Sequence, residues 1–294
     1  MSIKSNEITI NKQNNPEYEI MFDALINEVF GFSFDTWLER KLWDERYVSY
    51  SIVDNGKMLS NLCVCDTDMI VSGERFRAIQ LGAVCTSETA RGRGHSRQLM
   101  ERVLSDYSDV PMFLFANKSV LDFYPRFEFR QVQVYRPTLK AAANNRGALS
   151  ESEQKKVVKL AVDSPIVKSA IKSRSGYSKI LDCLNTQSIQ MFHLLKDYPE
   201  DIYYLPKLDV IIVAYQEENR LFIADVIASK PVTFEEIIIE LPFYNIEAIE
   251  FGFCPDWLEV TPTWESVPMS DVMFFIRGKW NLPDVFRFPA MSET

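Results

Sequence analysis

The sequence predicts an α/β fold, because segments with the periodicity of helices and of strands alternate along the chain. Residues 17–30 repeat apolar side chains at the spacing of an amphipathic helix. At residue 50 the period changes to that of strands, and residues 50–53 and 58–65 flank Asn55-Gly56, which tolerates the positive φ angles of a tight hairpin. A long apolar strand, residues 76–86, then runs directly into a Gly-rich loop that opens a helix.

The remaining elements continue this alternation through both halves of the chain. The first half is expected to hold a helix that contains residues 99–107, a strand at 112–116, a helix at 117–124 and a strand at 129–135. Ser150 and Glu153 form a capping-box pattern at the start of the second half. The elements expected there are helices at 153–162, 180–195 and 234–241 and strands at 210–215, 221–228, 248–253 and 271–277.

The chain is predicted to form two domains. Its 294 residues suit two domains or one large one, and 47% hydrophobic residues can build a sizeable core. The polar stretch 137–149 is the best candidate for a linker between them. We therefore expect one domain at residues 1–138 and a second, smaller α/β domain at residues 150–294.

Charge and cysteine content narrow the function classes. A net charge of −9 disfavours a general nucleic-acid binder, which needs clustered Lys and Arg for phosphates. Five cysteines at irregular spacing are no disulfide framework, and the polar N-terminal region holds no apolar signal core. No run of 18 apolar residues predicts a membrane span. A reduced cytoplasmic protein with no membrane contact is the resulting expectation.

Histidine content argues against two kinds of catalytic centre. The chain has only two histidines, His95 and His193. This disfavours a His-based metal site and a Ser-His-Asp triad, so no metal is expected. Cys63 and Cys65 lie on one face of the predicted strand, but they have no further candidate ligands beside them.

The loop at residues 91–96 is the segment that points most directly to chemistry. It reads Arg91-Gly92-Arg93-Gly94-His95-Ser96, directly after a buried strand and before a helix. Unpaired N–H groups and the partial positive charge at a helix N-terminus bind phosphates, and glycines let the backbone approach them. The loop lacks the Gly-Lys-Ser/Thr of a Walker motif and the third glycine of a Rossmann fingerprint.

Two motifs in this order resemble those of the GNAT superfamily of N-acetyltransferases. Residues 91–96 resemble its Arg/Gln-x-x-Gly-x-Gly/Ala loop, with Ser96 in place of the final Gly or Ala. Residues 117–129 resemble its second motif, Asn-x-x-Ala-x-x-Phe-Tyr-x-x-x-Gly-Phe, with Val120 for Ala and Glu128 for Gly. The resemblance covers roughly residues 17–136 and implies a GNAT-like acyltransferase fold with a mixed, mostly antiparallel sheet.

The resemblance also implies roles for individual residues. The pyrophosphate of acetyl-CoA would be held by Arg91, Gly92, Arg93, Gly94, His95 and Ser96. The backbone of Ala83, Val84 and Cys85 would bind the pantetheine arm and polarise the thioester carbonyl. Asn117 would contact the CoA chain, and Tyr124 would protonate the departing thiolate as the general acid. An amine would attack the thioester directly, without an enzyme nucleophile.

Several points stay open at this stage. Tyr124 could instead be a packed aromatic, and Cys85 is more typical of a small buried hydrophobe than of a nucleophile. Glu28, Asp66, Asp68 and Glu88 are the candidates for a general base. The second half is either a degenerate GNAT-like domain or an unrelated α+β domain.

The predicted function is that of an acetyl-CoA-dependent N-acetyltransferase acting on a small-molecule amine or a peptide. The whole layout resembles two-domain bacterial acetyltransferases, distantly including the enhanced intracellular survival type. The second half would cover the acceptor pocket or form a homodimer contact. One alternative is a non-catalytic acyl-CoA-binding sensor. Another is an aminoacyl transferase that uses charged tRNA, which the net charge of −9 disfavours.

Overall fold

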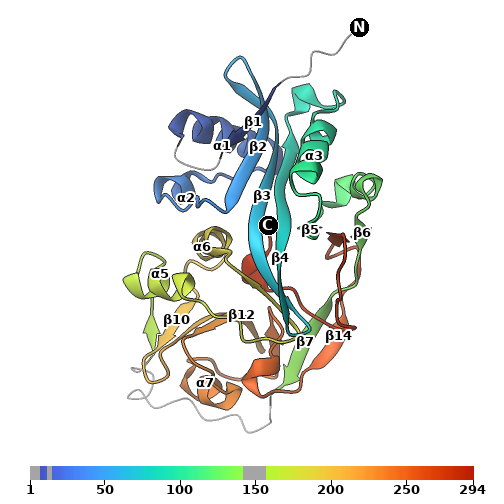
Figure 1. The fold of residues 1–294 in the computed structure, drawn as a ribbon. Coiled ribbons are helices and arrows are strands. Elements are labelled where there is room, and N and C mark those ends of the chain that lie inside the picture. Colours follow the sequence, from blue (N-terminus) through green and yellow to red (C-terminus); the bar gives the residue numbers. More distant parts are fainter. Residues whose placement is uncertain (1–6, 12–14, 142–156) are drawn as a thin grey trace.

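The fold contains two mixed sheets, which follow one another along the length of the molecule (Figure 1). The computed structural model describes residues 7–11, 15–141 and 157–294. The first sheet has the strand order β1-β2-β3-β4-β5-β15-β6, with β9 paired to β3. Its strands are β1 (Ile8–Asn11), β2 (Tyr47–Asp54), β3 (Lys57–Val71), β4 (Glu74–Thr86), β5 (Met112–Phe115), β6 (Arg130–Gln131), β9 (Leu181–Leu184) and β15 (Phe274–Arg277).

The second sheet has the order β14-β7-β13-β12-β11-β10-β8. Its strands are β7 (Tyr135–Lys140), β8 (Val158–Lys159), β10 (Ile202–Leu205), β11 (Val210–Glu217), β12 (Arg220–Ala228), β13 (Ala248–Phe251) and β14 (Thr263–Ser266). The described helices are α1 (Pro16–Phe30), α2 (Asp35–Glu39), α3 (His95–Asp106), α5 (Pro165–Lys172), α6 (Gln187–Lys196) and α7 (Phe234–Glu240). The α/β fold class predicted from the sequence is confirmed.

Local turn chemistry explains the long meander at the centre of the first sheet. Asn55 and Gly56, both at positive φ, join β2 to β3, and Ser72 and Gly73, again both at positive φ, join β3 to β4. Two successive residues at positive φ form the tight turn whose twist matches that of paired strands. The turn predicted at Asn55-Gly56 therefore lies where the sequence places it.

The helix at residues 16–30 is defined by its caps. The Asn15 side chain accepts a hydrogen bond from Tyr18 N, Pro16 occupies the first turn, and Gly31 ends the helix in the left-handed conformation. Its inner face buries Phe22 and other apolar residues against one face of the first sheet. The helix α3 covers the opposite face, so this sheet is the centre of a three-layer arrangement (Figure 1).

Strands from the second half of the sequence complete the first sheet. β15 pairs antiparallel with β5 on one side and with β6 on the other, and β9 pairs with β3 along residues 68–71. In the opposite direction, β7 leaves the first half and lies between β13 and β14 in the second sheet. The division into domains at 1–138 and 150–294 stays a prediction, but the two sheets exchange strands across it.

The predicted linker at 137–149 is wrong over its first four residues. Residues 137–140 belong to β7, where Leu139 packs against the core of the second sheet. The polar composition of the stretch concealed the strand, because only one of its two faces is buried. Residues 142–149 lie outside the described part of the chain.

Three predicted helices are also corrected. Residues 157–162 hold the short strand β8 rather than a helix, and residues 153–156 lie outside the described part. Residues 181–184 are the strand β9, and the helix α6 begins only at Gln187, after Asn185 at positive φ. All four residues of β9 are buried, and a buried run of only four residues is too short for its periodicity to separate strand from helix. Residues 118–120 and 124–127 form two 3-10 turns instead of one helix.

The second sheet repeats a unit of the first. β12, α7 and β13 form a strand, a helix and a parallel strand, as β4, α3 and β5 do. The parallel pairing stops at Ile223 and Phe251, and β12 runs on to Ala228. The space beyond is filled by the turn at residues 290–292, where Ala290 N donates a hydrogen bond to Gly252 O over 2.7 Å. This part of the second sheet is therefore packed with protein.

Two further observations concern the whole chain. All five cysteines are free and buried. Among the described residues, no helix is long and apolar enough to cross a membrane.

Candidate active site

The strands β4 and β5 separate at the centre of the first sheet. They pair in parallel from Ile79 with Met112 to Leu81 with Leu114, and β4 then continues to Thr86 past the last pair. A β-bulge lies at this point: Asn61 stands opposite Cys85 and Cys63 opposite Gly82, so two residues of β4 face one of β3. Bulges bend a strand and increase its twist. The bend opens a wedge between the two strands.

Ala83 has the strained backbone angle in this bulge. Its φ of 47° is a left-handed value that a residue with a Cβ rarely adopts. The Asn61 side chain holds the bulge in place, since its Nδ2 donates a hydrogen bond to Ala83 O over 2.9 Å. Asn61 is itself fully buried and accepts a hydrogen bond from the hydroxyl of Ser49. A polar network behind the sheet thus defines the backbone at the wedge.

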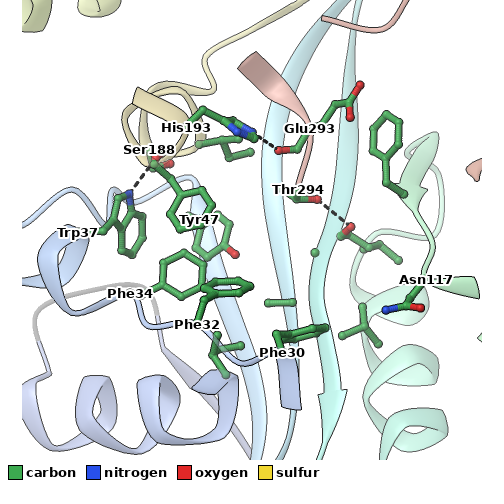
Figure 2. Close-up of a pocket in the computed structure, with 18 of the residues that line it drawn as sticks. Phe30, Phe32, Phe34, Trp37, Tyr47, Asn117, Ser188, His193, Glu293 and Thr294 are labelled. Atoms are coloured by element: carbon green, nitrogen blue, oxygen red, sulfur yellow. Dashed lines mark hydrogen bonds between the residues drawn. The ribbon is translucent and has the colours of Figure 1, made fainter. Parts of the chain in front are cut away.

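The wedge opens into a cavity of about 250 Å³ (Figure 2). Residues 81–84 of β4 form one wall. Phe115, Asn117, Val120 and Tyr124, from β5 and the turns after it, form the facing wall. Four of the residues predicted from sequence, Ala83, Val84, Asn117 and Tyr124, therefore line one cavity.

The Cys85 side chain lies outside this cavity. It is 5% exposed and packs in the core beneath α1, where burial raises the pKa of its thiol. Its carbonyl oxygen accepts a hydrogen bond from Ser60 Oγ over 2.8 Å. The interpretation of this side chain as a buried hydrophobe is confirmed.

The predicted phosphate loop lines a second cavity of about 380 Å³. Gly94 is the N-cap of α3 at a φ of 84°, and Gly92 has a φ of 74°. A Cβ at either glycine would meet no atom of the described residues within 4 Å, so the backbone angle, not crowding, requires glycine. Arg91, Gly92, Gly94, His95, Ser96 and Arg97 line this cavity together with Arg126 from the turn after Tyr124.

Charge and unpaired donors suit this cavity to an anion. Three arginines line it, and none of its described lining residues is acidic. No described side chain caps the start of α3, and the first turn of the helix holds no acid. His95 Nε2 is buried and has no hydrogen-bond partner among the described residues, while burial and the charge of Arg93 lower the pKa of the ring. These donors fit a pyrophosphate.

Two residues of the motif support the loop through hydrogen bonds, and one of them, Arg93, does not line the cavity. Arg93 Nη2 donates a hydrogen bond to Thr89 O over 2.9 Å, which ties the loop to the 3-10 turn before it. Ser96 Oγ lies 2.7 Å from Thr86 Oγ1 at the end of β4. The small hydroxyl at position 96 therefore joins the first turn of α3 to the strand.

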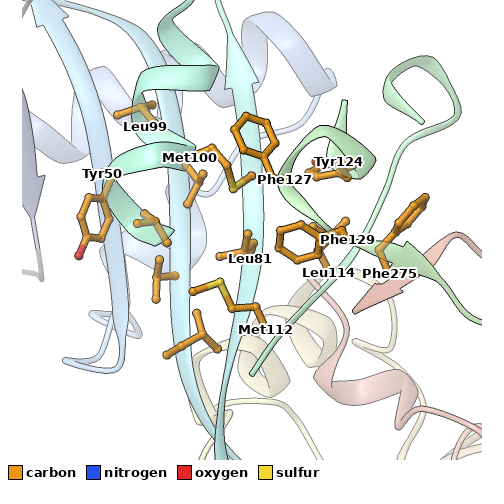
Figure 3. Close-up of a cluster of buried hydrophobic side chains, with 14 of the residues drawn as sticks. Tyr50, Leu81, Leu99, Met100, Met112, Leu114, Tyr124, Phe127, Phe129 and Phe275 are labelled. Atoms are coloured by element: carbon orange, nitrogen blue, oxygen red, sulfur yellow. The ribbon is translucent and has the colours of Figure 1, made fainter. Parts of the chain in front are cut away.

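Tyr124 is a packed aromatic residue and also lines the wedge cavity. Its ring is 4% exposed and packs between Phe123, Phe129 and Phe275 at centroid distances of 5.3–6.1 Å. Figure 3 shows Tyr124 beside Phe129 and Phe275. Burial, with the nearby Cys85 thiol, raises the pKa of its hydroxyl. The side chain also lines the wedge cavity. A packed, protonated phenol thus stands at the point where the two strands part.

Comparisons with known proteins agree with this geometry. The family described as "Acetyltransferase (GNAT) domain" matches residues 9–132. Residues 9–132 form a GNAT acetyltransferase domain. A search of the curated proteins found no match.

Solved structures extend the likeness beyond this GNAT domain to 92% of the chain. They include Eis1 from Mycobacterium abscessus (17% identity, TM-score 0.58, 73% of that chain) and a probable N-acyltransferase from Enterococcus faecalis (13%, 0.57, 72%). A GCN5-related N-acetyltransferase from Kribbella flavida is a third (15%, 0.54, 71%). At these identities the likeness concerns the fold. The chain therefore has the fold of two-domain GNAT proteins.

None of the acids proposed from sequence as a general base lines the wedge cavity of the GNAT domain. Asp66 and Asp68 are held in ion pairs with arginines of β4 at 2.8 and 2.7 Å. Glu28 accepts hydrogen bonds from Ser87 Oγ and Glu88 N, which lower the pKa of its carboxyl. These acids stabilise the sheet and the loop around the GNAT domain's site.

The far side of the wedge cavity is built from residues that the sequence did not indicate. The segment between α1 and α2 contributes Phe32 and Phe34, and α6 contributes Ser188, Phe192 and His193. Figure 2 shows Phe30, Phe32 and Phe34 grouped on one side of the cavity and Asn117 on the other. The sequence shows three phenylalanines within five positions, but it does not indicate that they lie at the wedge of the GNAT domain, because that position depends on the tertiary structure.

The segment at residues 293–294 also reaches this cavity. His193 Nε2 lies 2.7 Å from Glu293 O, and its Nδ1 lies 2.6 Å from Asp197 Oδ2. Thr294 Oγ1 donates a hydrogen bond to Leu81 O over 3.2 Å at the mouth of the wedge. Residues almost 300 positions from the chain start thus contact the central strand of the GNAT domain.

Proposed function

We propose that this protein is an acetyl-CoA-dependent N-acetyltransferase that transfers the acetyl group to an amine by direct attack on the thioester. One observation supports this most strongly. The bulged strand β4 leads from the wedge at Ala83 to the phosphate loop at residues 91–96, with Tyr124 beside the wedge. The same strand can then carry the thioester end and the pyrophosphate end of one extended co-substrate.

The residues of the loop would hold the pyrophosphate. The N–H groups at the start of α3 and the side chains of Arg91, Arg97 and Arg126 surround the second cavity and supply donors and positive charge. Acetyl-CoA supplies the acyl group as a co-substrate. The proposal assigns the reaction to side chains and backbone groups of the chain.

The wedge would position the thioester. The residues of β4 beyond Leu81 have left the ladder with β5. Side chains of β3 bind the carbonyls of Ala83 and Cys85, and the backbone groups that remain would be available to the arm of the co-substrate. Donors aimed at the carbonyl oxygen stabilise the charge that develops on it. Tyr124 would give its proton to the departing thiolate, and its high pKa keeps that proton available.

Thiol release from acetyl-CoA tests this proposal. The purified protein should release CoA in the presence of primary amines, with the mass of the amine increased by one acetyl group. Omission of the amine should leave only slow hydrolysis. Binding of acetyl-CoA without thiol release for any amine would contradict the proposal and favour a non-catalytic acyl-CoA sensor.

A further inference from the structure

The acceptor side of the wedge cavity has an aromatic wall. Phe34 stacks on Phe192 with a centroid distance of 4.6 Å, and Phe32 lies 5.4 Å from Phe34. Phe30 stacks on Phe32 at 6.0 Å. Trp37 packs behind Phe34 at 5.4 Å. Rings from α1, the segment after it and α6 thus form one apolar surface at the cavity. Figure 2 shows Phe30, Phe32 and Phe34 of this surface.

This wall is only partly covered by protein. Phe34 and Trp37 are buried, but Phe30 is 37% exposed and Phe32 and Phe192 are half-buried. Apolar surface that faces a cavity is stabilised when a ligand removes it from water, and aromatic rings prefer offset or edge contacts with another ring. The wall is therefore suited to a flat apolar group of the acceptor.

The charges around the cavity disfavour a polycation. Glu293 provides the single acidic side chain among its described lining residues, and Arg287 lies 3.9 Å from it. Lys196 Nζ lies 3.5 Å from the centroid of the Phe32 ring, which places a positive charge at the same wall. A polyamine or an aminoglycoside needs several acids to replace the water around its ammonium groups. This cavity offers one.

We propose that the acceptor is a primary amine carried on an aromatic ring system, of the arylalkylamine class. This inference rests on the function proposed above and specifies its substrate. The ring would lie against Phe34 and Phe192, and the amine would reach the thioester at the wedge beside Ala83 and Tyr124. The neutral nitrogen forms a bond to the acetyl carbon and loses one proton to water. The C–S bond breaks, and the thiolate takes a proton from Tyr124, which solvent restores.

Steady-state kinetics with matched amines test the inference. The probes are 2-phenylethylamine and tryptamine, compared with 2-cyclohexylethylamine, spermidine, an aminoglycoside and a short lysine peptide. We expect kcat/KM for the aromatic amines to exceed that for the cyclohexyl analogue by roughly tenfold, because the analogue keeps size but loses ring stacking. Spermidine, the aminoglycoside and the peptide should be poorer still.

Variants of the wall supply a second measurement. Phe192→Leu should lower kcat/KM for 2-phenylethylamine by roughly tenfold and leave the KM for acetyl-CoA unchanged. Phe192→Tyr, which keeps the ring, should retain the preference. Phe243→Leu is the matched control, because Phe243 packs on Tyr203 in the second sheet, away from the wedge. Melting temperatures establish that each variant folds.

The outcomes separate the two proposals. Higher kcat/KM for spermidine, the aminoglycoside or the peptide would overturn the aromatic acceptor and leave the acetyltransferase intact. A Phe192→Leu variant with unchanged selectivity would do the same. Absence of thiol release with every amine, from protein that binds acetyl-CoA, would overturn both.

Discussion

Ala83 shows how one backbone angle can shape a site. Its positive φ accompanies the bulge that turns β4 away from β5, and the Asn61 side chain stabilises that conformation from behind the sheet. Strained backbone persists where its surroundings determine it, and such positions concentrate at functional sites. The two predictions at this scale concern Tyr124 and Gly94, which stand beside the wedge and at the phosphate loop.

Tyr124→Phe should lower kcat by on the order of 10²-fold, the lower end of the usual effect of removing a general acid, because a thiolate is already a fair leaving group. The ring contacts with Phe123, Phe129 and Phe275 remain, so the melting temperature should change little. The measurement is single-turnover acetyl transfer, with acetyl-CoA affinity determined in parallel. A normal chemical step in this variant would make Tyr124 a structural aromatic and leave the fold unaffected.

Gly94→Asp should abolish the rise in melting temperature that acetyl-CoA causes by binding the native state. Gly94→Asn is the matched control, since both side chains tolerate the left-handed conformation and only one is charged. A Cβ at this position meets no described atom within 4 Å, so both variants should fold. Equal thermal shifts for the Asp and Asn variants would show that no anion binds at this helix N-terminus.

At the scale of elements, α6 both lines the wedge cavity and contacts the segment at residues 293–294. Its Phe192 forms part of the aromatic wall, and its His193 contacts both Asp197 and the main chain at Glu293. Asp197 Oδ2 and Glu293 O both accept hydrogen bonds, so the geometry is satisfied when both ring nitrogens donate. The helix thereby holds residues 293–294 against the wedge.

The contact between His193 and Asp197 predicts a dependence of stability on pH. The hydrogen bond from His193 lowers the pKa of Asp197, so the pair stabilises the fold above the ordinary carboxyl pKa of about 3.9 and loses this effect as the pH falls through the folded value. Asp197→Asn should therefore lower the free energy of unfolding at neutral pH and match the wild type in acid. The difference should stay below about 1 kcal/mol, because the carboxylate is 41% exposed.

Urea unfolding of both proteins across this pH range is the measurement. If the free energies of unfolding of wild type and Asp197→Asn differ by the same amount at every pH, the predicted link between ionisation of Asp197 and stability is wrong. The exposed ion pair of Arg102 and Asp106 on α3 has the same i, i+4 spacing, and it serves as the comparison for the pair of His193 and Asp197.

At the scale of the whole molecule, a buried charge cluster and exchanged strands join the two sheets. Arg174 contacts Asp182 of β9 and Asp225 of β12, each over 3.1 Å, and all three side chains are less than 10% exposed. β9 belongs to the first sheet and β12 to the second. The relative position of the two halves, and hence of α6 over the GNAT domain, depends on these contacts.

Arg174→Met should lower the free energy of unfolding by about 3–5 kcal/mol, because two buried carboxylates lose their cation. Replacing Asp182 and Asp225 by leucine in the same protein should recover most of this loss. Arg75→Met is the control, since its pair with Asp68 is exposed and worth at most about 1 kcal/mol. Chemical unfolding measures all three. A single variant as stable as the control would show that Arg174 does not bridge the sheets.

The exchanged strands predict that the first half does not fold alone. A fragment of residues 1–141 lacks β15 and β9, so the apolar edge of β5 would be unpaired and prone to aggregation. Co-expression with residues 142–294 should return soluble protein whose melting temperature rises with acetyl-CoA. A soluble, monomeric 1–141 fragment that binds acetyl-CoA would instead support independent domains divided at residue 138.

The elements that depend on local signals were predicted correctly from the sequence. The hairpin turn at residues 55–56, the helix at 16–30 and the Gly-rich loop before α3 all depend on residues within a few positions of one another. The motif at 117–129 likewise placed Asn117 and Tyr124 in the cavity, although the helix predicted there is two 3-10 turns. Backbone angles, caps and periodicity are properties of short segments, so composition and spacing reveal them.

Contacts between distant segments were decided by the tertiary structure. Nothing near residue 274 indicates that β15 lies between β5 and β6, because strand pairing depends on the register of two chains that are far apart in sequence. The aromatic wall of the wedge cavity combines Phe34 with Phe192 for the same reason. The strand β7 and the buried strand β9 were misassigned, because the polarity of a segment and a run of four buried residues do not indicate which sheet the segment joins. The Gly-rich loop could thus be located from sequence, whereas the aromatic wall of the wedge cavity exists only in the folded chain.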